Sequence, residues 1–142
     1  MQIARRIGKN LKGGEVLELI SDVGGGKTTF VRGLAKGAGS KNHVSSPTFT
    51  ISKVYKAPTF EIVHFDFYRL EEAGLIEHEI EEAVFDPKSV IVVEWSDVVK
   101  HVLPEDRLKI SFYISREDDR ELKFTYPAEL EYLLEDIHDI NN

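Results

Sequence analysis

The spacing of apolar residues predicts helices and strands in alternation along the chain. Apolar residues recur at every fourth position over 3–11, the repeat of a short amphipathic helix that a glycine pair ends. The apolar run 16–20 indicates a buried strand, and a glycine-rich turn follows it. Apolar residues on one face of 30–38 then predict a second helix, which Gly37 and Gly39 stop.

The middle of the chain continues the pattern. Residues 49–55 and 61–66 alternate between apolar and polar positions, which predicts two strands joined as a hairpin around Ala57-Pro58. Residues 70–84 have the spacing of a helix with one acidic side. Residues 90–93 are continuously apolar, which is typical of a strand that is buried on both faces.

The C-terminal part predicts a short helix near 96–102 and a second hairpin formed by 108–115 and 121–126. Apolar residues over 127–140 have the stripe of a final amphipathic helix that opens at a proline. Strands that alternate with helices are typical of an α/β domain, and the two hairpins make its sheet mixed. We therefore expect one domain over the whole chain, with 127–140 as a helical extension.

Composition narrows the class of protein. A chain of 142 residues is long enough for one domain with its own core. The absence of cysteine excludes disulfides, thiolate metal ligands and cysteine nucleophiles. No apolar run approaches the ~18 residues of a membrane span, and the N-terminus lacks the apolar core of a signal peptide. We expect a cytoplasmic protein that does not contact membranes.

Charge is distributed unevenly between the two halves. The net charge is −7, but residues 1–60 carry a balance of +7 and residues 61–142 a balance of −14. Proteins that bind nucleic acid directly usually present a basic patch, so the acidic half disfavours strong direct binding. We expect any contact with nucleic acid to be made through a partner protein.

The segment Ser-Asp-Val-Gly-Gly-Gly-Lys-Thr-Thr at 21–29 carries the clearest chemical signal. A glycine-rich turn between a strand and a helix lets backbone N–H groups converge on a phosphate, and the helix N-terminus adds partial positive charge. Lys27 would reach the β- and γ-phosphates, and the Thr28 hydroxyl would bind Mg²⁺. The expected fold is therefore the three-layer P-loop NTPase fold, a central mixed sheet flanked by helices. The predicted ATP-binding residues of this loop are Asp22, Val23, Gly24, Gly25, Gly26, Lys27, Thr28 and Thr29.

Two carboxylates end predicted strands and are candidates for metal binding and hydrolysis. Glu94 closes the apolar strand 90–93, as the acid of a Walker B pattern does, and Asp66 closes the strand before it. Ligands of open α/β sheets bind at the carboxyl ends of the strands. The alternative for each residue is a solvated strand-end acid, and for Asp66 also an ion pair with Arg69.

Three further signals leave their alternatives open. Residues 45–48 contain hydroxyl groups that suit a switch loop sensing a γ-phosphate, but a plain turn fits equally well. Trp95 either borders the nucleotide site or anchors the core. The five histidines have no metal-ligand spacing, and we interpret them as surface residues or as buried residues with satisfied hydrogen bonds.

Four segments together resemble the bacterial TsaE family, also called YjeE, in order and spacing. They are Gly-Gly-Gly-Lys-Thr-Thr-Phe at 24–30, Ser-Pro-Thr-Phe-Thr at 46–50, His-Phe-Asp-Phe-Tyr-Arg-Leu at 64–70 and Val-Glu-Trp at 93–95. The first segment alone fits many families, whereas the set is specific and spans about residues 3–125.

The resemblance implies a small Mg²⁺-dependent ATPase of tRNA threonylcarbamoyladenosine biosynthesis. Such a protein joins TsaB and TsaD, whose complex modifies the adenosine beside the anticodon, and its nucleotide cycle resets that complex while the partner performs the transfer. It reaches tRNA only through these partners. By matching motif, the site residues would be Thr28 and Glu94 for Mg²⁺, Asp66 with Glu94 and Lys27 for hydrolysis, Thr48 in the switch loop and Trp95 beside the site.

The chain departs from the family in three places. Ser21 replaces the first glycine of the loop. The sequence starts inside the first helix, whereas relatives usually carry a short segment with a threonine ahead of that helix, close to the adenine. The predicted helix over 127–140 lies beyond the usual family core.

Two other functions use the same loop. A small-molecule kinase would need an arginine-bearing lid, for which only Arg116 and Arg120 are candidates. A nucleotide-gated binding module with negligible hydrolysis is the non-enzyme alternative, since no arginine finger stands out. A GTPase is disfavoured because the chain has no Asn-Lys-x-Asp sequence to read guanine.

Overall fold

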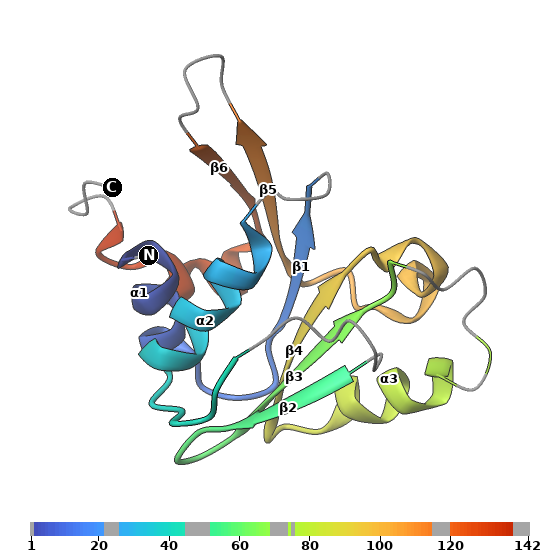
Figure 1. The fold of residues 1–142 in the computed structure, drawn as a ribbon. Coiled ribbons are helices and arrows are strands. Elements are labelled where there is room, and N and C mark those ends of the chain that lie inside the picture. Colours follow the sequence, from blue (N-terminus) through green and yellow to red (C-terminus); the bar gives the residue numbers. More distant parts are fainter. Residues whose placement is uncertain are drawn as a thin grey trace.

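Six strands form one mixed sheet in the order β2-β3-β4-β1-β5-β6 (Figure 1). The computed structural model describes residues 2–21, 26–44, 52–68, 74, 76–114 and 120–137. The strands are β1 (Val16–Ile20), β2 (Ser52–Lys56), β3 (Glu61–Asp66), β4 (Ser89–Glu94), β5 (Leu108–Ile114) and β6 (Arg120–Thr125). The four inner strands are parallel to one another, and each edge strand pairs antiparallel as one half of a predicted hairpin.

Helices cover both faces of this sheet and give the α/β fold that the sequence predicts (Figure 1). One face packs against α1 (Gln2–Asn10), α2 (Lys27–Gly37) and the 3₁₀ helix η3 (Ala128–Leu134). The other face packs against α3 (Ile76–Phe85) and the segment with η1 (Ser96–Val98) and η2 (Lys100–Val102).

The continuous apolar run of β4 is explained by its place between β3 and β1. Val90 and Val92 belong to the core cluster under α2, whereas Ile91 and Val93 belong to the cluster under α3. All four side chains are completely buried. The alternation of side chains along a strand therefore fixes Glu94 on the α2 face, with Val90 and Val92.

Three predicted helices differ from the observed ones. The helix expected over 70–84 begins at Ile76, because Gly74 lies in a turn with a φ of +52°; residues 70–73 and 75 lie outside the described residues. The helix expected near 96–102 consists of two 3₁₀ turns. The helix expected over 127–140 is a 3₁₀ helix that ends at Leu134, and residues 138–140 lie outside the described residues. Its buried Leu130 and Leu133 are three residues apart, the period of a 3₁₀ helix.

The last 3₁₀ helix is tied to the start of the sheet through Glu15. The Tyr132 hydroxyl donates to Oε2 of Glu15 at 2.5 Å, and burial together with this bond raises the pKa of Tyr132. Glu15 also accepts the backbone N–H groups of Lys12 and Gly13 at 2.8 and 2.7 Å. One buried carboxylate thus holds the α1–β1 turn and the C-terminal segment together.

Glycines bring α1 and α2 into close contact. A Cβ added at Gly8 would lie 2.0 Å from the carbonyl oxygen of Leu34, and one added at Gly37 would lie 2.0 Å from the carbonyl oxygen of Arg5. Gly37 is the last residue of α2, so its sequence signal as a helix stop coincides with a packing requirement. This contact fixes the helix whose N-terminus begins at Lys27.

We expect Gly37→Ala to lower the free energy of unfolding by about 1–3 kcal/mol, because the added methyl group forces the two helix backbones apart. This change is a net value, because alanine favours a helix over glycine by about 1 kcal/mol and so offsets part of the packing cost. Urea denaturation measures the change. Gly74→Ala is the control, since a Cβ there meets nothing within 4 Å and costs only backbone strain. Unchanged stability of Gly37→Ala would contradict the close contact.

Candidate functional site

The candidate site lies where the carboxyl ends of β1, β3 and β4 meet the N-terminus of α2. Gly26 precedes α2 in the left-handed conformation, with a φ of 89°, and Lys27 opens the helix. Glycine adopts this conformation without the steric cost that a side chain would add. The other predicted loop residues, Asp22, Val23, Gly24 and Gly25, lie outside the described residues.

Lys27 and Glu94 face each other, as the predicted site requires. The Lys27 ammonium lies 3.7 Å from Oε1 of Glu94, and both side chains are almost completely buried. A buried charge pair is costly to desolvate unless further hydrogen bonds satisfy it. The second oxygen of Glu94 has such a bond, to Nε2 of His64 at 2.5 Å.

His64 is a site residue that the sequence interpretation missed. It is completely buried on β3, and its Nδ1 is the only buried side-chain nitrogen or oxygen in the described part of the chain without a hydrogen-bond partner. The interpretation of the histidines as surface or satisfied residues is therefore wrong for this one. The sequence signal for this residue is the alternation of side chains along a strand. His64 lies two positions before Asp66 on the same strand, so the two side chains lie on the same face of the sheet.

Trp95 contacts Lys27 and also packs on the core. Its ring centroid is 4.4 Å from the Lys27 ammonium, within reach of a cation–π interaction, and 5.0 Å from the ring of Tyr68. Its ring also packs against the core cluster under α3. Its backbone is left-handed, with a φ of 55°, where the chain turns from β4 into η1.

Asp66 lies beside Glu94, because the two residues are partners in the register of β3 and β4. Its Oδ1 accepts the backbone N–H of Tyr68 at 3.0 Å. Burial raises the pKa of Asp66 and the charge of Glu94 adds to this, whereas the hydrogen bond from Tyr68 and the nearby His64 and Lys27 oppose it. Arg69, the alternative partner, lies outside the described residues.

The remaining predicted residues offer oxygen ligands but not a complete metal cage. Thr28 is half-buried and Thr29 is exposed in the first turn of α2, while Thr48 and the rest of 45–51 lie outside the described residues. The described residues contain no group of three or more His, Cys, Asp or Glu side chains able to hold a metal. A threonine hydroxyl and a carboxylate, as in Thr28 and Glu94, are nevertheless the kinds of oxygen ligand that Mg²⁺ takes together with water and substrate phosphates.

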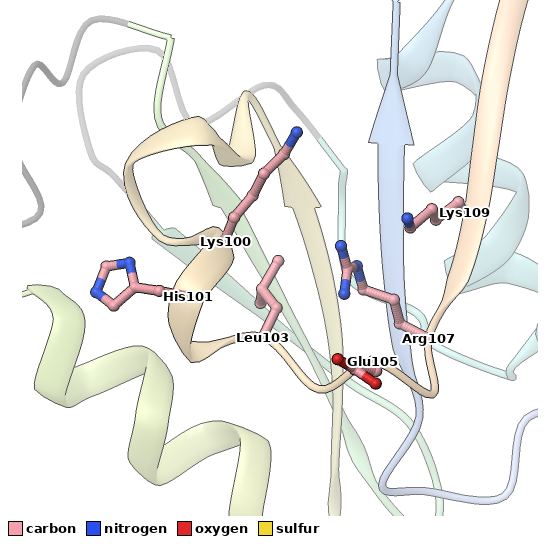
Figure 2. A pocket seen from close by; sticks show the side chains of 6 residues that line it. All are labelled: Lys100, His101, Leu103, Glu105, Arg107 and Lys109. Carbon is pink, nitrogen blue, oxygen red and sulfur yellow. The ribbon is translucent and has the colours of Figure 1, made fainter.

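A cavity lies on the opposite face of the sheet, beside η2 and β5. This cavity has a volume of about 580 Å³. It is lined by six residues, whose side chains are drawn in Figure 2: Lys100, His101, Leu103, Glu105, Arg107 and Lys109. Most of its charge is neutralised locally: Arg107 Nε donates to the buried Glu18 at 3.1 Å, and the Lys100 ammonium lies 3.3 Å from Asp97. Ser96 also donates to Glu18, so this cluster anchors the segment directly after Trp95. We place the candidate site on the α2 face for these reasons.

We expect Asp66→Asn to stabilise the free protein near neutral pH. The pKa of Asp66 is raised in the folded state, so ionisation of this carboxyl destabilises the fold. Stability is therefore lost as the pH rises from the pKa of the unfolded state through that of the folded state, and the loss persists at higher pH. The amide removes that cost, and the gain should vanish below the unfolded value of about 3.8. Thermal unfolding of both proteins between pH 3 and 8 measures this. A variant that is less stable at pH 7 would contradict the direction of the shift.

Comparisons with known proteins identify the family of this chain. The family described as "Threonylcarbamoyl adenosine biosynthesis protein TsaE" matches residues 1–122. The chain is 39% identical over 127 residues to the tRNA threonylcarbamoyladenosine biosynthesis protein TsaE of Bacillus subtilis, covering 87% of this chain and 77% of the relative. It is 41% identical over 114 residues to that of Streptomyces coelicolor, covering 77% of this chain and 75% of the relative. The crystal structure of Bacillus subtilis YdiB matches with a TM-score of 0.76 and 35% identity, covering 97% of this chain and 87% of that chain. The chain therefore belongs to the TsaE family.

Proposed function

We propose that this protein binds Mg·ATP and hydrolyses it slowly to drive a step of tRNA threonylcarbamoyladenosine biosynthesis. The observation that carries the proposal is the buried Lys27–Glu94 pair at the N-terminus of α2. The two relatives named above are described as proteins of that pathway. The TsaB–TsaD complex is the proposed partner, and ATP binding and hydrolysis would cycle its assembly.

Each residue has a role that follows from its position. Lys27 and the backbone N–H groups at the start of α2 bind the phosphates, because the ammonium and the helix N-terminus both favour anions. Thr28 and Glu94 would hold Mg²⁺, which would neutralise phosphate charge. A triphosphate competes with Glu94 and Trp95 for the Lys27 ammonium, which now lies between them.

Asp66 is the carboxylate we assign to hydrolysis. It is beside Glu94 in register and half-buried, and its raised pKa brings it closer to the range in which a carboxylate accepts a proton efficiently. No arginine in the described ranges pairs with Asp66 or Glu94. P-loop enzymes without an arginine that stabilises the transition state turn over slowly until a partner completes the site.

We expect Lys27→Ala to weaken Mg·ATP binding about tenfold to a hundredfold, because it removes a charge-assisted contact worth roughly 1.5–3 kcal/mol. Isothermal titration calorimetry measures the affinity. Lys36→Ala is the matched control, since Lys36 lies in the last turn of the same helix, far from its N-terminus. Equal affinity in wild type and Lys27→Ala would refute nucleotide binding at this loop.

We expect Asp66→Asn to bind ATP as wild type does and to lose turnover, because the amide keeps the shape but cannot accept a proton or orient water through a charge. Phosphate release is measured with and without the partner complex and tRNA, with the exposed Asp97→Asn as the control. In wild type the partners should raise the rate, and association should be tighter with ATP than with ADP, since coupling between sites is reciprocal. Equal association with both nucleotides and no stimulation would favour an inert binding module or a kinase.

A further inference from the structure

The hydrogen bond between His64 and Glu94 occupies one of the two carboxylate oxygens of Glu94. Oε2 of Glu94 is 2.5 Å from His64 Nε2, and Oε1 is 3.7 Å from the Lys27 ammonium. The two oxygens therefore face different partners, from β3 on one side and from α2 on the other. Only Oε1 points toward the start of α2, where the proposed phosphate site lies.

The chemistry of the pair fixes the direction of the bond. An ionised carboxylate only accepts hydrogen bonds, so the proton lies on Nε2 of His64 and is donated to Glu94. His64 Nδ1 is then left buried and without a partner among the described residues. An unsatisfied buried polar atom costs about 1–3 kcal/mol, and such an atom in a folded protein calls for an explanation.

Packing holds the imidazole in this costly position. His64 is 0% exposed, and its ring lies 6.3 Å from the ring of Tyr55 on the neighbouring strand β2, at 42° between planes. An apolar side chain of the same volume would avoid the unsatisfied nitrogen but would leave Oε2 of Glu94 without its donor. The bond to Glu94 is the interaction that only a donor at this position supplies.

We infer that His64 is a positioning residue that occupies one oxygen of Glu94, so that Glu94 offers a single oxygen to a cation beside Lys27. The inference rests on the proposed Mg·ATP function. A carboxylate restricted to one oxygen suits Mg²⁺, which requires near-ideal octahedral geometry. It disfavours Ca²⁺, which commonly takes both oxygens of a carboxylate and a larger coordination number. His64 thereby contributes to metal selectivity without touching the metal.

The test compares three variants of the whole chain. His64→Leu removes the donor, His64→Gln keeps an amide donor at a similar reach, and His64→Asn keeps an amide that is too short to reach Glu94. ATP is titrated calorimetrically into each variant in the presence of Mg²⁺, in the presence of Ca²⁺ and without either metal. These titrations give the metal dependence of ATP binding. Thermal unfolding of each variant shows whether the fold is retained.

We expect His64→Leu to lower the apparent Mg²⁺ affinity of the ATP complex by about 10–100-fold, the usual effect of losing a partner of a metal ligand. The preference for Mg²⁺ over Ca²⁺ should narrow in His64→Leu, and His64→Gln should restore the wild-type preference. Where His64→Leu does not fold, the Gln and Asn variants carry the same comparison, because they differ only in reach.

The outcomes separate this inference from the function on which it rests. One outcome is that wild-type ATP binding depends on Mg²⁺ but all variants have the same Mg²⁺ affinity and the same preference for Mg²⁺ over Ca²⁺. This outcome overturns the role of His64 and leaves the proposed function standing. ATP binding that is independent of Mg²⁺ in wild type, or unaffected by Lys27→Ala, overturns the proposed function itself.

Discussion

The buried carboxylate of Glu94 is the constraint around which the site is organised. Glu94 is only 3% exposed, and a charge so placed is tolerated where opposite charge and hydrogen bonds surround it. Lys27 supplies the charge from α2, and His64 supplies the hydrogen bond from β3. Removal of either partner alone leaves a buried charge incompletely compensated, so the three positions are energetically coupled.

The sheet brings these groups together because its inner strands are parallel. Parallel pairing in register sets His64 opposite Val92 and Asp66 opposite Glu94, and it leads β1 toward the same edge. The close glycine contact between α1 and α2 then fixes the helix that starts with Lys27. The fold therefore determines the distances in the site through backbone pairing and helix packing, with few loop residues involved in the described part.

Much of this arrangement is predictable from sequence, for reasons that particular residues show. The order of strands and helices is confirmed. Four predicted site residues lie together: Lys27, Glu94, Asp66 and Trp95. Their proximity could be predicted because the apolar pattern indicates where strands end and where the helix begins. His64 was missed because a single histidine on an apolar strand has the same pattern as a core residue, and its partner is distant in sequence. The apolar stripe over 127–140 predicts a helix but does not distinguish an α-helix from a 3₁₀ helix, because the spacing of Leu130 and Leu133 suits both periods and only the hydrogen bonds differ.

Trp95 gives the protein an optical property that follows from its position. It is the only tryptophan of the chain, and the Lys27 ammonium lies 4.4 Å from its ring centroid. The emission of an indole depends on the charge and polarity around it. A ligand that draws this ammonium away from the ring would change the intrinsic fluorescence of the protein. The occupancy of the site could therefore be followed in real time without a label. The same signal could be used in the presence of a partner that has no tryptophan near its contact surface.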